Sequence, residues 1–103
     1  MAAQTAASSR VNLELESLRL MIGDLADVAA DWPELSGVER ASWSLDWDQI
    51  MGSLEALLDP AYRAGLMTPD QQERYGDLLC RLRDGTPTLE WLGLQQPSIP
   101  LEP

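Results

Sequence analysis

The chain has 103 residues, 45% of them hydrophobic, and a formal charge of −10 from 17 acidic and 7 basic residues. This length is enough for one compact core but not for two. The charge argues against nucleic acid and anionic membranes as partners, because proteins that bind them need clustered positive charge. With no histidine and a single cysteine, Cys80, the chain lacks the usual general base, the commonest transition-metal ligand and any internal disulfide. We therefore expect one domain without a cofactor or a metal.

The sequence also bears on cellular location. No stretch approaches the ~18 consecutive apolar residues of a membrane span. The first ten residues, MAAQTAASSR, lack the basic start and the apolar middle of a secretory signal. All seven bases are arginine and the chain has no Phe, which is the amino-acid usage of a GC-rich genome. We expect a soluble, cytoplasmic protein from a bacterium.

The N-terminal part of the chain predicts a short flexible segment followed by a long helix. Residues 1–8 are mostly small and show no apolar periodicity, so we expect them to be flexible. Over residues 11–32 apolar side chains recur at alternating spacings of four and three, which is typical of one buried helix face. Ser8 or Ser9 suits the cap that begins this helix, and Pro33 ends it.

The stretch SWSLDWDQ begins the second predicted helix, over residues 42–58. Trp43 and Trp47 fall on the same helix face as the apolar residues that follow them, so we expect both rings in the core. A capping-box pattern at residues 36–39 predicts a short helical turn before this helix. Pro60 ends it.

Two Thr-Pro pairs predict the starts of two further helices. The first, at residues 68–69, belongs to a capping box and predicts a third helix that Gly85 ends. The second predicts a short fourth helix around residues 87–92 that lays Trp91 across the bundle. Residues 94–103 contain three prolines, which predicts an extended tail.

These elements predict an all-α fold, a small helical bundle of three main helices with a short fourth helix and an extended Pro-rich C-terminal tail. The single helical domain covers residues 9–93, between a flexible N-terminus of residues 1–8 and the tail of residues 94–103. A DNA-binding helix-turn-helix is a poor alternative, because acids are interspersed among the arginines of the third helix.

The outer face of the first helix is the leading candidate for a partner site. Like charges at spacings of three and four destabilise a helix slightly, and no base on this sector is expected to relieve them. Exposed leucines followed by acids would suit a partner with an apolar groove and a basic rim. The alternatives are an ordinary solvated face and a homodimer in which the leucines meet their copies. The candidate residues are Leu13, Glu16, Leu20, Asp24, Asp27 and Asp31.

The tail is a second candidate site. Prolines at every third position match one turn of a polyproline II helix, which a partner's aromatic groove can bind through Pro97, Ile99, Pro100 and Leu101. The alternative, which we weigh equally, is that the tail packs back on the bundle.

Two other motifs favour structure over chemistry. Asp46 and Asp48 supply only part of a metal's coordination shell, and we interpret them as acids near a helix start. Cys80 shares its helix sector with carboxylates, which oppose formation of the reactive thiolate.

The leading functional hypothesis is a small acidic, non-catalytic protein-protein interaction module, such as an adaptor, a chaperone-like protein or an antitoxin-like regulator. Its partner would be another protein with a basic or basic-rimmed surface. One alternative is an acidic mimic of nucleic acid that inhibits a nucleic-acid-binding protein. Another is an enzyme that uses carboxylates alone, which requires a pocketed acid with a raised pKa.

Overall fold

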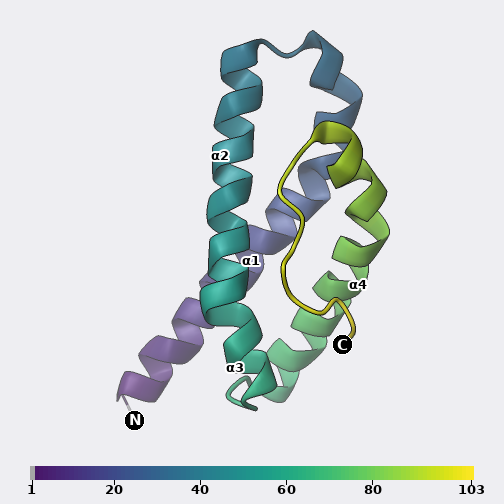
Figure 1. The fold of residues 1–103 in the computed structure, drawn as a ribbon. Coiled ribbons are helices and arrows are strands. Elements are labelled where there is room, and N and C mark those ends of the chain that lie inside the picture. Colours follow the sequence, from purple (N-terminus) through teal and green to yellow (C-terminus); the bar gives the residue numbers. More distant parts are fainter. Residues whose placement is uncertain (1) are drawn as a thin grey trace.

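The structure, a computed structural model, describes residues 2–103, and these fold into a bundle of helices (Figure 1). Within residues 2–103 there is no strand, which confirms the all-α class. The bundle measures 48 × 26 × 19 Å, and α1, at ~45 Å, accounts for the longest dimension. In chain order the elements are α1 (Ala2–Asp31), the 3-10 turn η1 (Trp32–Glu34), α2 (Gly37–Ser53), the π-helical segment η2 (Leu54–Leu58), α3 (Asp59–Arg63) and α4 (Pro69–Leu92).

Helix α1 buries the apolar stripe that its sequence predicts, and it packs against both α4 and α2. It begins at Ala2 and not at a serine cap at Ser8 or Ser9, as the sequence predicts. The alanine-rich start of the chain has the high helix propensity that this extension needs. The flexibility expected of residues 1–8 stays a prediction. The buried positions of the stripe are Val11, Leu15, Leu18, Ile22 and Leu25.

Helix α2 begins at Gly37, so the predicted start at residue 42 is wrong. Ser36 and Glu39 form the complete capping box: the Glu39 N–H donates to Ser36 Oγ, and the Ser36 N–H donates to Glu39 Oε1, each at 3.1 Å. The pattern expected to make a separate turn therefore starts the main helix itself. This shift places Glu39 on the same helix as Trp43 and Asp46.

Pro60 does not end the second helical rod, because η2 and α3 continue it to Arg63. A proline ring clashes with the carbonyl four residues earlier in a regular α-helix and cannot donate a hydrogen bond. The chain widens immediately before this point: the Asp59 N–H bonds to Leu54 O, five residues back. Leu54 and Leu58 remain buried, so the rod keeps its apolar face through the irregularity.

Helix α4 joins the third and fourth helices that the sequence predicts as separate, so the short fourth helix is not a distinct element. It starts with the predicted Thr68 capping box and passes through Gly85 and Pro87 to Gly93, which adopts a left-handed φ of 71°. A Cβ on Gly85 would lie 3.3 Å from Leu25 Cδ2. Gly85 therefore marks the close approach of α4 to α1 and not a helix end.

Continuation of α4 also corrects the position of Trp91. Leu82, Leu89 and Leu92 are buried on one face of the uninterrupted helix. Trp91 lies off this face and is 64% exposed, so it does not cross the bundle as the sequence predicts.

Residues 94–103 form neither helix nor strand and run back along the bundle beside α2 and α4 (Figure 1). The indole N–H of Trp47 in α2 donates to Gln95 O at 2.9 Å. Further along, Arg63 in α3 donates to the carbonyl oxygens of Pro100 and Glu102 at 3.1 and 3.2 Å. Leu94 is buried. The C-terminal segment thus completes the core between α2 and α4.

Candidate functional site

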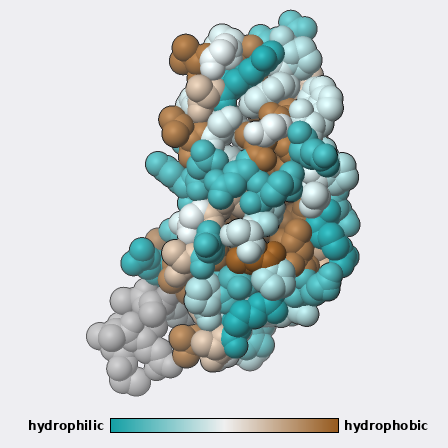
Figure 2. All heavy atoms as spheres, in the orientation of Figure 1, coloured by the Kyte–Doolittle hydropathy of each residue, from teal (hydrophilic) through white to brown (hydrophobic). Residues whose placement is uncertain are grey.

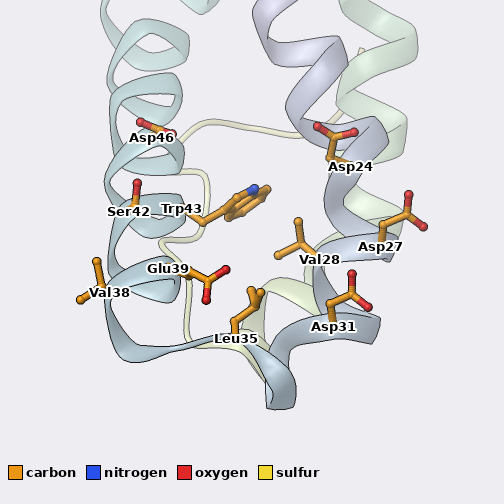
Figure 3. Close-up of a pocket in the computed structure, with 10 residues that line it drawn as sticks. All are labelled: Asp24, Asp27, Val28, Asp31, Leu35, Val38, Glu39, Ser42, Trp43 and Asp46. Carbon is orange, nitrogen blue, oxygen red and sulfur yellow. The ribbon is translucent and has the colours of Figure 1, made fainter.

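A groove lies between the C-terminal half of α1 and the N-terminal half of α2, where the two helices stand apart on either side of η1 (Figure 3). Its volume is about 530 Å³. The short connection through residues 32–36 turns the chain back, so both helices contribute side chains to the same space. We call this site the acidic groove.

Five carboxylates line the acidic groove in two rows. Asp24, Asp27 and Asp31 form the α1 row, and their spacing of three and four residues places them on one helix face. Glu39 and Asp46 form the α2 row, seven residues apart. Figure 3 shows Asp31 and Glu39 toward the connecting loop and Asp24 and Asp46 at the other end. Each row is ~10 Å long at the 1.5 Å rise of a helix.

The space between the two rows is apolar. Its lining includes Val28 from α1, Leu35 from the connection and Trp43 from α2, and Val38 lies at the outer edge of α2. The Trp43 ring points into the space between the helices (Figure 3). It stacks on the buried Trp47 ring, with centroids 5.7 Å apart and planes at 12°. Trp43 is half-buried, so the prediction that both tryptophans lie in the core holds fully only for Trp47.

The negative charge of the acidic groove is not neutralised by ion pairs among the described residues. The three salt bridges found there join Arg19 to Glu16, Arg63 to Asp59 and Arg74 to Asp70. All five groove acids are exposed to solvent. Their side chains are therefore available to a cationic ligand.

Arg40, which follows Glu39 in the sequence, contacts Trp32. Arg40 Nε donates to Trp32 O at 2.9 Å, and its guanidinium lies 5.6 Å from the Trp32 ring centroid. Glu39 has a local hydrogen-bond partner, since the backbone N–H of Ser36 donates to it. That bond, together with the Ser36 side chain, lowers the pKa of Glu39 below its usual value and favours the charged form.

The predicted site residues of α1 divide into two groups. Asp24, Asp27 and Asp31 lie in the acidic groove. Leu13 and Leu20 precede it on the same helix, 69% and 52% exposed, and Leu20 is one helical turn before Asp24.

Glu16 differs from what the sequence predicts, because Arg19 does relieve it. The Arg19 guanidinium donates to both carboxylate oxygens of Glu16, and this pairing lowers the pKa of Glu16. The α1 surface before the acidic groove is therefore partly neutralised.

Exposed hydrophobic residues alone do not mark a site on this molecule. Large apolar side chains project from several elements, including Val38 and Leu45 in α2 and Leu66 after α3. On the face drawn in Figure 2, the hydrophobic surface is broken into separate spots among hydrophilic groups. The acidic groove stands out because charge and an apolar floor occur together in a concave surface.

The tail residues pack on the bundle. Ile99 and Leu101 are half-buried against the core, Pro97 is half-buried, and the Pro100 carbonyl is bonded to Arg63. The sequence leaves open whether the tail binds a partner or packs back on the bundle, and in the structure it packs on the bundle.

The α2 wall is the part of the acidic groove that sequence reasoning missed. Glu39, Ser42 and Asp46 repeat the three-and-four spacing of the α1 row. That signal was present, but a helix started at residue 42 leaves Glu39 outside it. Val28, Leu35 and Trp43 could not be assigned to a shared surface without the path of the connection.

The described residues contain no group of three or more metal-ligating side chains placed to hold an ion. In the same part of the chain, none of the helices combines the length and apolar character needed to cross a membrane. Cys80 is half-buried on α4, away from the residues of the acidic groove. Comparison with protein-family models, with curated proteins and with solved structures found no match.

Proposed function

We propose that this protein is a small, non-catalytic interaction module that binds another protein through the acidic groove and the adjoining outer face of α1. The observation that carries this proposal is the meeting around an apolar floor of five exposed carboxylates that form no salt bridge with the described residues. Such a surface complements a partner with basic residues around an apolar contact, because opposite potentials steer association and apolar burial stabilises it.

The acidic groove supports binding better than catalysis. A carboxylate enzyme needs an acid held in a desolvated cleft, where its pKa is raised toward the working pH. All five groove acids are exposed, so solvent screens them. A non-catalytic role is accordingly the function we favour.

Two finer features belong to the same proposal. We infer that the protein works in the cytoplasm, and that residues 94–103 are an extended segment whose main role is to complete the core. The tail then contributes to binding only where its exposed residues adjoin the partner.

The test is affinity capture of partners at low and at high salt with three proteins. The first is wild type. The second, Asp27→Asn with Asp31→Asn, removes two charges from the α1 row, and the third, Leu13→Asp with Leu20→Asp, places charges on the leucine face. Wild type should capture a basic protein that high salt releases, because screening weakens exposed charge pairs.

A matched control removes two charges from elsewhere. Glu73 and Asp77 are exposed on α4, and neither lines the acidic groove. The Glu73→Gln, Asp77→Asn variant should therefore capture the partner as wild type does, whereas both α1 variants should capture less. Equal capture by all four proteins would place the binding surface elsewhere.

The nucleic-acid mimic remains a separate candidate that shares the acidic surface. It predicts that the captured protein binds nucleic acid and that added nucleic acid displaces it. A partner that nucleic acid does not displace supports the interaction module.

A further inference from the structure

We propose that the acidic groove binds an amphipathic helix of another protein that carries arginine side chains. This inference rests on the proposed function and specifies the chemistry of the partner. It draws on three properties of the groove: the spacing of its charges, the orientation of Trp43 and the apolar floor between the two rows.

The charge rows match the side-chain repeat of a helix. The α1 row spans positions 24 to 31 and the α2 row spans positions 39 to 46, which is seven residues in each case. Seven residues are two helical turns, or ~10 Å. A partner helix with cationic side chains three, four and seven residues apart would present them over the same length to both rows.

The aromatic residue favours arginine over lysine. Trp43 stacks on Trp47 with one face, and its ring points into the acidic groove. Tryptophan is the best aromatic partner for a cation, and the planar guanidinium both stacks on a ring and bonds carboxylates in pairs. Among the described residues two arginines already lie over aromatic rings: Arg40 over Trp32 and Arg63 over Tyr62, 5.6 and 5.1 Å from the ring centroids.

The apolar floor accounts for the amphipathic character of the partner. Val28, Leu35 and Trp43 line the acidic groove, whereas Val38 lies at its outer edge and points away from the space between the helices (Figure 3). A ligand that is cationic throughout would leave this apolar surface in water. A leucine or similar side chain between the arginines would cover it and gain the free energy of apolar burial.

A second copy of this chain does not fit the description. Its helix richest in arginine, α4, carries Arg74, Arg81 and Arg83, but acids alternate with them along the helix. The chain as a whole is at −10, so two copies repel each other at the acidic groove. The partner is therefore a different, basic protein.

The experiment titrates the intact protein with three synthetic peptides of about 15 residues, or ~22 Å as a helix. Each has a leucine stripe, and the opposite face carries arginine, lysine or glutamate at identical positions. Isothermal titration calorimetry gives the affinity of each. The arginine peptide should bind about tenfold more tightly than the lysine peptide, and the glutamate peptide should not bind.

Variants locate the binding surface. Asp27→Asn with Asp31→Asn should weaken the arginine peptide about tenfold. Trp43→Leu should reduce the preference for arginine over lysine to about twofold. The control Glu73→Gln, Asp77→Asn removes the same charge from α4 and should change the affinity by less than about twofold. Because the Asp→Asn changes are at exposed positions, they keep the test decisive even where Trp43→Leu unfolds the protein.

Three results would overturn the inference. The first is a lysine peptide that binds as tightly as the arginine peptide. The second is spermine that competes for the acidic groove as strongly as the arginine peptide does. The third is an α4 control variant that loses as much affinity for the arginine peptide as the α1 variant. Failure here is distinguishable from failure of the proposed function. If the α1 variants still capture less of a basic protein than wild type does, but no arginine peptide binds, the proposed interaction module is retained. Only the inference that the partner is an arginine-bearing helix is then rejected.

Discussion

Truncation of Trp47 is expected to destabilise the protein far more than truncation of Trp43. Trp47 is fully buried, and its indole N–H donates to Gln95 O at 2.9 Å. Replacement of a buried tryptophan by alanine costs about 3–5 kcal/mol, and the lost hydrogen bond adds up to ~1 kcal/mol. Trp43 is half-buried with one face on Trp47, so we expect Trp43→Ala to cost only about 1–2 kcal/mol.

Urea unfolding followed by helical circular dichroism measures this difference. For a small domain with a slope of roughly 1.5 kcal/mol per molar, Trp47→Ala should lower the midpoint by about 2–4 M and Trp43→Ala by about 1 M. Trp47→Phe serves as a control, because it keeps an aromatic ring and loses the N–H donor. Equal losses for the two alanine variants would refute the assignment of Trp47 to the core and Trp43 to the acidic groove.

Four further predictions concern the two cap residues of α2, the buried phenol and the C-terminal segment. Ser36→Ala should cost ~1 kcal/mol in thermal unfolding by removing the cap of α2. Glu39, whose pKa is lowered, should stabilise the fold above its unfolded pKa of ~4.3 and lose that contribution as pH falls through the folded value, so the wild-type advantage over Glu39→Gln should vanish in acid titrations. Burial, and then the hydrogen bond to Asp59, raise the pKa of Tyr75, so its contribution is complete below the unfolded pKa of ~10 and is lost as pH rises through the folded value. In Tyr62→Phe protein, tyrosinate absorbance should therefore appear only with unfolding. Removal of residues 94–103 strips a buried leucine and the Trp47 acceptor from the core, and should lower the melting temperature; an unchanged melting temperature would contradict the packed arrangement.

Local signals in the sequence located the buried faces better than the helix ends. The stripe of α1 and the Thr68 capping box were both predictable, because the three-and-four repeat and the cap chemistry act within a few residues. The sequence predicts that Pro60 ends one helix and that Pro87 begins another, yet both lie inside longer helical rods. Tertiary packing decides these cases, since apolar residues continue on the same face beyond each proline.

One of the two rows of acids in the acidic groove could be predicted from the sequence. The α1 row follows from sequence spacing alone, whereas the α2 row depends on a helix start at Gly37 and on a connection that folds α2 back beside α1. The orientation of Trp43 toward the acidic groove also depends on that path. Such long-range geometry leaves no local pattern in the chain, apart from the repeat of Glu39, Ser42 and Asp46.

The indole N–H resonances of the four tryptophans give the most direct test of the acidic groove as the binding surface. They can be assigned in heteronuclear NMR spectra by single Trp→Phe variants and followed while the arginine peptide is added. We expect the largest shift at Trp43, which lines the acidic groove, and almost none at Trp91, which is 64% exposed on α4 outside it. A shift at Trp91 that equals or exceeds the one at Trp43 would contradict binding in the acidic groove.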